Sequence, residues 1–206
     1  MTGLRAADAQ TFSRCMAVHG VAVFPADTVY GLACEPGSKQ AVRRLYALKG
    51  RAPGKPAAVM FFDRDLALAA LPELGPSVRA AVPRLLPGGL TLLVPNPAGR
   101  FPLACADEPG TLGIRVPALA DALAPLRAVR WPVLQSSANA AGAPDARRLD
   151  DVPQEIRAGA DLVLDAGALP GTPSTVLDLR RYDADGTWTI VREGAVSAQE
   201  IGRRLG

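Results

Sequence analysis

Short apolar runs rich in β-branched residues alternate with amphipathic segments along the chain, and this alternation limits the fold more than any other feature. Runs of this kind are typical of strands, and the segments between them have the apolar spacing of helices. A chain that repeats strand and helix in this way forms a sheet covered by helices. We therefore predict an α/β fold: a single domain, residues 1–206, with a twisted mixed β-sheet of about seven strands flanked by helices.

The element boundaries follow from caps and breakers. Ser38 is a predicted N-cap and Gly50 closes the helix that follows it. Further helices are expected around 64–71, 76–86 and 118–129, the last of these kinked at Pro125, and from Ser197 onward. The runs that predict strands are 21–24, 56–62, 90–94, 112–116, 132–136, 161–165, 174–179 and 187–192.

Composition excludes several classes of protein. With 49% hydrophobic and 21% charged residues, a chain of 206 residues can form a core without disulfides or a structural metal. A single histidine excludes a His-rich metal site, and no protein metal site is predicted. No run approaches 18 apolar residues, and Asp8 interrupts the position of a signal-peptide core, so we expect a cytoplasmic protein without membrane association. The three cysteines, too far apart for a CxxC pattern, are expected to be buried thiols.

One loop carries an excess of positive charge. Residues 43–55 contain five cations and no acid, and the last three are Lys49, Arg51 and Lys55. Cations near a helix C-terminus suit the helix dipole, so a solvated cap is one interpretation. A clamp for a polyphosphate is the other, because a guanidinium and two ammonium groups can neutralise three phosphates. No GxxxxGK[ST] or GxGxxG sequence is present.

Polar residues at strand ends form the other candidate sites. Ser137 and Asn139 follow an apolar strand and precede a turn of small residues, which lets backbone N–H groups approach a ligand. Arg115 lies inside an apolar strand, and a buried cation needs an anion, which can be a protein carboxylate or a ligand. Similar polar residues stand at 27–28, 174–175 and 192.

Taken in order, these segments resemble the YrdC-like family of threonylcarbamoyl-AMP synthases from about residue 21 to residue 197. The family has an opening like P-T-[DE]-T-V-Y-G-L, and residues 25–32 read PADTVYGL. The remaining matches are KGRAPGKP (49–56), PGGLT (87–91), TLGIRVP (111–117), SSAN (136–139), STVLD (174–178) and REGA (192–195).

The resemblance implies an L-threonylcarbamoyladenylate synthase. Such an enzyme condenses L-threonine, bicarbonate or CO2, and ATP, with Mg2+, to threonylcarbamoyl-AMP and pyrophosphate. Downstream threonylcarbamoyl-transfer proteins then modify tRNA, with which a weak contact is expected. The implied catalytic residues are Lys49, Arg51, Ser137 and Asn139; the ATP-binding residues are Arg51, Lys55, Thr111, Ser137, Asn139 and Arg192; the threonine-binding residues are Thr28, Arg115 and Ser174.

Four positions depart from the family pattern. Ala26 and Ala141 replace hydroxyl residues, which leaves the amino-acid preference less defined than the use of ATP. Glu193 stands where proline is common, and Ala57 where a larger aliphatic residue is common; both changes are expected to be tolerated.

Three alternatives remain. The chain could be a YrdC-like RNA-binding module without synthase activity, although 5% aromatic residues leave few stacking platforms for single strands. It could be a paralogue with altered activity. The K-x-R and S-x-N pairs are both intact, which favours the synthase instead. A carbamoyl-transfer domain of a hydrogenase-maturation protein would be accompanied by acylphosphatase and zinc-finger regions, which this sequence does not contain.

Overall fold

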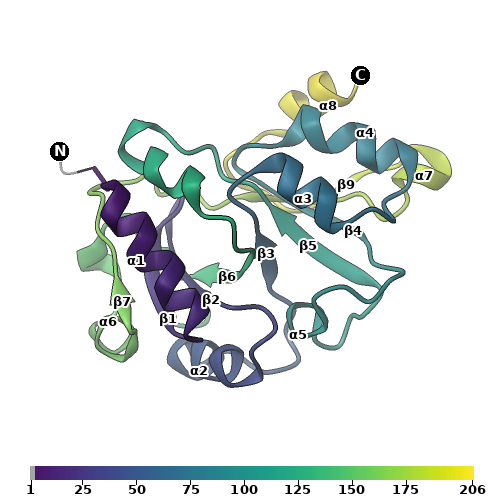
Figure 1. The fold of residues 1–206 in the computed structure, drawn as a ribbon. Helices are drawn as coiled ribbons and strands as arrows, with labels where there is room; N and C mark the ends of the chain where they lie inside the picture. Colours follow the sequence, from purple (N-terminus) through teal and green to yellow (C-terminus); the bar gives the residue numbers. More distant parts are fainter. Residues whose placement is uncertain (1–2) are drawn as a thin grey trace.

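The computed structural model describes residues 3–206, and its strands form one mixed sheet in the order β7-β1-β2-β6-β3-β5-β4-β8-β9 (Figure 1). Pairing is parallel for β7–β1, β3–β5 and β4–β8, and antiparallel for the other neighbours. The predicted mixed α/β sheet is thus confirmed. The strands are β1 (Val21–Pro25), β2 (Tyr30–Cys34), β3 (Ala58–Met60), β4 (Leu90–Pro95), β5 (Thr111–Arg115), β6 (Val133–Ser137), β7 (Leu162–Val163), β8 (Thr175–Asp178) and β9 (Thr189–Arg192).

Helices pack at both ends of this sheet (Figure 1). α1 and α2 pack on β1, α2 also packs on β2, and α4 packs against α7 and α8 toward the other end. The α-helices are α1 (Ala6–Ala17), α2 (Lys39–Lys49), α3 (Arg64–Ala70), α4 (Pro76–Leu85), α5 (Pro102–Cys105), α6 (Gln154–Gly159), α7 (Tyr182–Asp185) and α8 (Ala198–Leu205). The segments η1 (Asp121–Ala128) and η2 (Leu149–Asp151) are 3-10 helices.

The core lies between the central strands and these helices. Every residue of β1 and β2 is buried, as expected for strands covered on both faces. Phe12 of α1 contacts Phe24 of β1 and Phe62, with ring centroids 5.3 and 5.7 Å away. Aromatic pairs at such distances add to the free energy gained from burial, so they fix α1 against the sheet.

Within residues 3–206 the sheet has nine strands, where about seven were predicted. The additional strand in the interior is β2, whose sequence YGLAC contains glycine and alanine in place of the usual β-branched residues. Hairpin pairing with β1 and burial on both faces override this weak propensity. The run 56–62 forms a strand only at Ala58–Met60, and the run 161–165 only at Leu162–Val163.

The predicted helix boundaries agree best with the structure where the sequence contains capping residues. The Ser38 hydroxyl accepts a hydrogen bond from the backbone N–H of Ala41, and Gly50 ends α2 in the left-handed conformation with φ of 60°. The predicted helix at 118–129 is shorter and is the 3-10 helix η1. Pro125 lies inside it and lacks the N–H that an α-helical turn requires.

All three cysteines are buried and free of disulfides, as predicted from the sequence. Within residues 3–206, every helix is too short or too polar to traverse a bilayer.

The Asp161 carboxylate joins α2 to the start of β1. It accepts hydrogen bonds from the Val21 backbone N–H at 2.7 Å and from both terminal nitrogens of Arg44 at 2.9 and 3.1 Å. The hydrogen bonds from Arg44 and then from Val21 lower the pKa of Asp161. Its ionised form is therefore the form that stabilises this junction.

We expect Asp161→Asn to destabilise the protein in a pH-dependent way. A carboxyl whose pKa is lowered by folding contributes fully above its unfolded pKa of about 3.9. That contribution disappears as the pH falls through the folded pKa. The difference in free energy of unfolding between wild type and variant, measured in urea, should therefore shrink between pH 5 and pH 3. Asp150→Asn, at a carboxylate that is 95% exposed, is the control. A difference independent of pH would contradict the role of the charge.

Candidate active site

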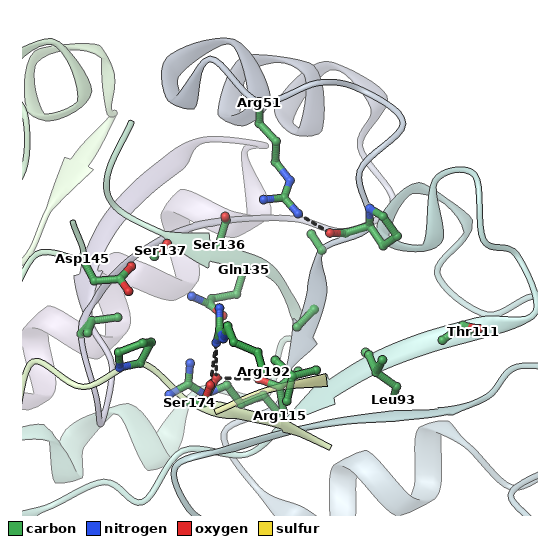
Figure 2. A pocket seen from close by; sticks show the side chains of 18 of the residues that line it. Arg51, Leu93, Thr111, Arg115, Gln135, Ser136, Ser137, Asp145, Ser174 and Arg192 are labelled. Carbon is green, nitrogen blue, oxygen red and sulfur yellow. Dashed lines mark hydrogen bonds between the residues drawn. The ribbon is translucent and has the colours of Figure 1, made fainter. Parts of the chain in front are cut away.

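A cavity of about 310 Å3 lies over one face of the central strands (Figure 2). One row of paired residues crosses it: Gln135 pairs with Ala58, and Ala58 pairs with Gly113. The row continues from Gly113 to Leu93. Paired residues on neighbouring strands project to the same face of a sheet. Since alanine and glycine have almost no side chain, the space between Gln135 and Leu93 stays open.

Arg115, at the end of β5, forms a buried ion pair beside this cavity. Its Nη2 lies 2.5 Å from Asp27 Oδ1 and 2.6 Å from Thr28 Oγ1, and its side chain is 3% exposed. The second Asp27 oxygen accepts a hydrogen bond from the Ala118 backbone N–H. Of the two anions that the sequence left open for Arg115, the structure thus supplies a protein carboxylate. Arg115 also lines the cavity, and its buried Nε has no partner among residues 3–206.

Ser174 and Arg192 form an adjoining wall of the cavity. The Ser174 hydroxyl lies 2.8 Å from the Thr91 hydroxyl, and Arg192 Nη2 donates to the Ser174 carbonyl at 2.6 Å and to its hydroxyl at 3.2 Å. Figure 2 shows both bonds to Arg192. Burial, opposed by Asp145 and aided by Arg115, lowers the pKa of Arg192, which nevertheless remains charged at neutral pH.

Gly194 permits the chain after β9 to approach this wall. A Cβ at this position would lie 2.3 Å from the Pro173 carbonyl oxygen and 2.6 Å from two further backbone atoms. The Ala195 backbone N–H donates to that same carbonyl at 2.8 Å. Because backbone atoms cannot yield to a side chain here, glycine is required two residues after Arg192.

Lys49 ends α2 as a buried cation surrounded by oxygen atoms. Its Nζ donates to the Ser137 carbonyl at 2.7 Å and hydroxyl at 3.2 Å. It also donates to the Asn139 carbonyl at 3.0 Å and side-chain oxygen at 2.5 Å. The residue is 4% exposed. Burial and then the Arg51 charge lower the pKa of Lys49 to about 8. The ammonium thereby fixes the loop that carries Ser137 and Asn139.

Arg51 is the cation of this loop that reaches the cavity. Its Nη2 donates to the Pro56 carbonyl, and its guanidinium carbon lies 5.7 Å from the centre of the Tyr46 ring. These contacts hold the side chain against the end of α2. Lys55, by contrast, is exposed and does not line the cavity.

Two carboxylates, Glu108 and Asp145, complete the charged lining of the cavity. With Arg51, Arg115 and Arg192 they form a polar, mainly cationic pocket suited to a polyanion. No group of three potential metal-ligating His, Cys, Asp or Glu side chains occurs within residues 3–206. The three guanidinium groups of the lining can position an anionic ligand and neutralise its charge.

The residues that the sequence singled out fall into three groups. Lys55 forms the first group, outside the cavity. Lys49, Asn139 and Thr28 are buried behind its wall, where Asn139 accepts from the Ser137 hydroxyl at 2.7 Å and Thr28 accepts from Arg115. The residues that line the cavity directly are Arg51, Thr111, Arg115, Ser137, Ser174 and Arg192.

Two positions where the family pattern has a hydroxyl residue and this chain has alanine lie outside the cavity lining. Ala26 is fully buried in the core, and Ala141 is exposed on the loop after Asn139. Neither residue is part of the cavity lining, so their methyl groups leave its polar surface unchanged.

Sequence reasoning did not assign roles to Asp27, Gln135 or Asp145. Gln135 carries the same signal as Arg115, a polar residue inside an apolar strand, and could have been found by it. Asp27 precedes Thr28 in a segment already singled out. Asp145 lies in a loop of ordinary turn composition, which gives no signal.

The chain matches a family model over most of its length. The model Sua5_yciO_yrdC, described as "Telomere recombination", matches residues 15–194. The threonylcarbamoyl-AMP synthase of Bacillus subtilis is 31% identical over 90% of this chain and 53% of its own length. The threonylcarbamoyl-AMP synthase of Chromohalobacter salexigens is 36% identical over 76% of this chain and 84% of its own. The chain thus spans about half the length of the Bacillus subtilis relative and of a similar Pyrococcus abyssi synthase.

The fold of this chain is similar to that of a solved structure. Sua5 of Pyrococcus abyssi, described as complexed with L-threonine, superposes with a TM-score of 0.85 and 24% identity. The match covers 98% of this chain and 58% of that one. At this identity the likeness concerns the fold alone.

We expect Lys49→Met to lower the free energy of unfolding by about 2–4 kcal/mol, because it leaves several buried oxygens without a donor. Lys55→Met is the matched control, and its exposed side chain should matter by less than about 0.5 kcal/mol. Urea unfolding of both variants at pH 7 tests this. Equal stability of the two would mean that the Lys49 ammonium does not hold the loop.

Proposed function

Because the chain belongs to the Sua5/YciO/YrdC family, we propose that it is an L-threonylcarbamoyladenylate synthase. It would condense L-threonine, bicarbonate or CO2, and ATP to threonylcarbamoyl-AMP and pyrophosphate. The relatives named threonylcarbamoyl-AMP synthase support this function. So does the solved Sua5 described with L-threonine.

The observation that carries the proposal is the convergence of three guanidinium groups on one cavity. Arg51 comes from the loop after α2, Arg115 from β5 and Arg192 from β9, at distant points in the sequence. Ser137 and Ser174 line the same cavity. Such a lining suits a nucleoside triphosphate together with an amino acid carboxylate.

The proposed reaction has two steps. The threonine amine forms an N–C bond with CO2 and releases a proton to solvent, or forms it with bicarbonate and releases water, and either route gives a carbamate. A carbamate oxygen then attacks the α-phosphorus of ATP in line, and the bond to the β-phosphate breaks with release of pyrophosphate. Neither step requires a protein nucleophile, and alignment with charge stabilisation supplies most of the acceleration. One preorganised donor contributes about 3–4 kcal/mol to such a transition state.

On the nucleotide side, Arg51, Thr111, Ser137 and Arg192 would contact ATP. Lys49 and Asn139 would hold the Ser137 loop through the hydrogen bonds described above. The exposed Lys55 has a flexible side chain that could reach the outer phosphates.

On the amino-acid side, Arg115 and Ser174 would bind L-threonine. Thr28 and Asp27 orient the Arg115 guanidinium from behind. Asp27 occupies one terminal nitrogen of Arg115, so the remaining N–H groups are those available to a substrate carboxylate.

Mg2+ would neutralise phosphate charge in this cavity. Glu108 and Asp145 are carboxylates of the hard-oxygen type that Mg2+ accepts, and phosphate and water would supply its other ligands. The product would pass to threonylcarbamoyl-transfer proteins that modify tRNA, with at most a weak contact between this chain and the tRNA itself.

The direct test is pyrophosphate release. We expect the purified chain to release pyrophosphate from ATP when L-threonine, bicarbonate and Mg2+ are all present, and to lose this release when any substrate is omitted. Binding of tRNA without any such turnover would favour an RNA-binding module instead.

We expect Gly113→Val to reduce this activity about 100-fold, because its side chain would fill the cavity floor and displace the reactants. A Cβ at Gly113 meets its nearest neighbour, Ala58, at 3.5 Å, and valine suits a strand, so the fold should persist. Gly110→Val is the matched control, since a Cβ there meets no atom within 4 Å. Full activity in Gly113→Val, with an unchanged melting temperature, would show that the reactants bind elsewhere.

A further inference from the structure

Gln135, in the middle of β6, is a buried side chain without a partner. The residue is 6% exposed and lines the cavity. Within residues 3–206 its carboxamide has no hydrogen-bond partner, yet it is not among the fully enclosed polar atoms, so it opens onto the cavity. Buried amides are normally hydrogen-bonded, because an unpaired buried amide costs free energy. An unpaired carboxamide that faces a cavity is therefore available to a ligand.

The neighbouring strands β2 and β3 place small residues beside Gln135. Its neighbours in the sheet are Ala33 on β2 and Ala58 on β3. The place of a Cβ at Gly31 is 3.0 Å from Gln135 Nε2, so the amide lies against bare backbone on that side. On the side of β2 and β3 the carboxamide therefore meets alanine and bare backbone, and its open side faces the cavity.

Gln135 lies between the proposed nucleotide side and the proposed amino-acid side of the cavity. In Figure 2 its carboxamide lies between Ser137, assigned above to the nucleotide side, and Ser174, assigned to the amino-acid side. All of these residues line the same cavity. Gln135 therefore projects where the groups bound by the two sides would meet.

We propose that the Gln135 carboxamide binds the one-carbon carboxylate that joins amino acid and nucleotide, as bicarbonate or as the carbamate. This inference rests on the proposed function. The Nε2 group donates hydrogen bonds without carrying charge. It can therefore orient one carboxylate oxygen by a neutral hydrogen bond, which reduces the nucleophilicity of the carboxylate less than an ion pair from the same position would.

A packing role is the competing explanation, and Gln135→Met separates the two. Methionine matches glutamine in length and fills the same space, but it donates no hydrogen bond. Gln10→Met, the same change at an exposed position of α1 away from this cavity, is the matched control. Gln135→Glu keeps the shape, loses the donor and adds a negative charge.

The experiment measures pyrophosphate release in buffers freed of CO2, with one substrate varied at a time. For Gln135→Met we expect the KM for bicarbonate to rise about tenfold, and the KM values for ATP and L-threonine to change less than about twofold. Gln135→Glu should raise the KM for bicarbonate further. Gln10→Met should match wild type.

Two results would overturn the inference. One is a bicarbonate KM in Gln135→Met equal to that of wild type. The other is a parallel rise in all three KM values with a lower melting temperature, which would indicate packing. Absence of pyrophosphate release in wild type is a separate result, which overturns the proposed function itself.

Discussion

The buried ion pair between Arg115 and Asp27 is the contact on which the geometry of the cavity depends. Arg115 ends β5, and Asp27 lies in the connection between β1 and β2, several strands away in the sheet. Both side chains are at most 5% exposed, so either charge alone would be costly to bury. The pair therefore fixes the β1–β2 connection across the face of the sheet, with Thr28 bound to the same guanidinium nitrogen.

A second buried cation, Lys49, fixes another segment beside the cavity, as Arg115 fixes the β1–β2 connection. Its ammonium collects the oxygens of Ser137 and Asn139 and holds a loop of small residues in place. Some cations of the protein are thus used internally to hold loops beside the cavity, whereas Arg51 and Arg192 line it. Rigid walls reduce the reorganisation needed when a charged ligand binds.

Much of the fold could be predicted from local signals. Ser38 and Gly50 define α2 because capping depends on a few adjacent residues. β2 could not be predicted, because its glycine and alanine have low strand propensity and only pairing with β1 and β6 makes it a strand. In the site, motifs pointed to Ser137 and Arg192, but no local pattern distinguishes a residue that lines the cavity from one that holds its wall.

The sequence by itself determined the alternation of strands and helices, the polar strand ends and the family to which the chain belongs, because each depends on the order and type of neighbouring residues. Only the tertiary structure decided that Arg115 pairs with Asp27, that Lys49 is enclosed by oxygens, and that Gln135 faces the cavity unpaired. The physical reason is that burial and partnership of a polar group arise from strands distant in the chain, and the free energy of a charge depends on those surroundings.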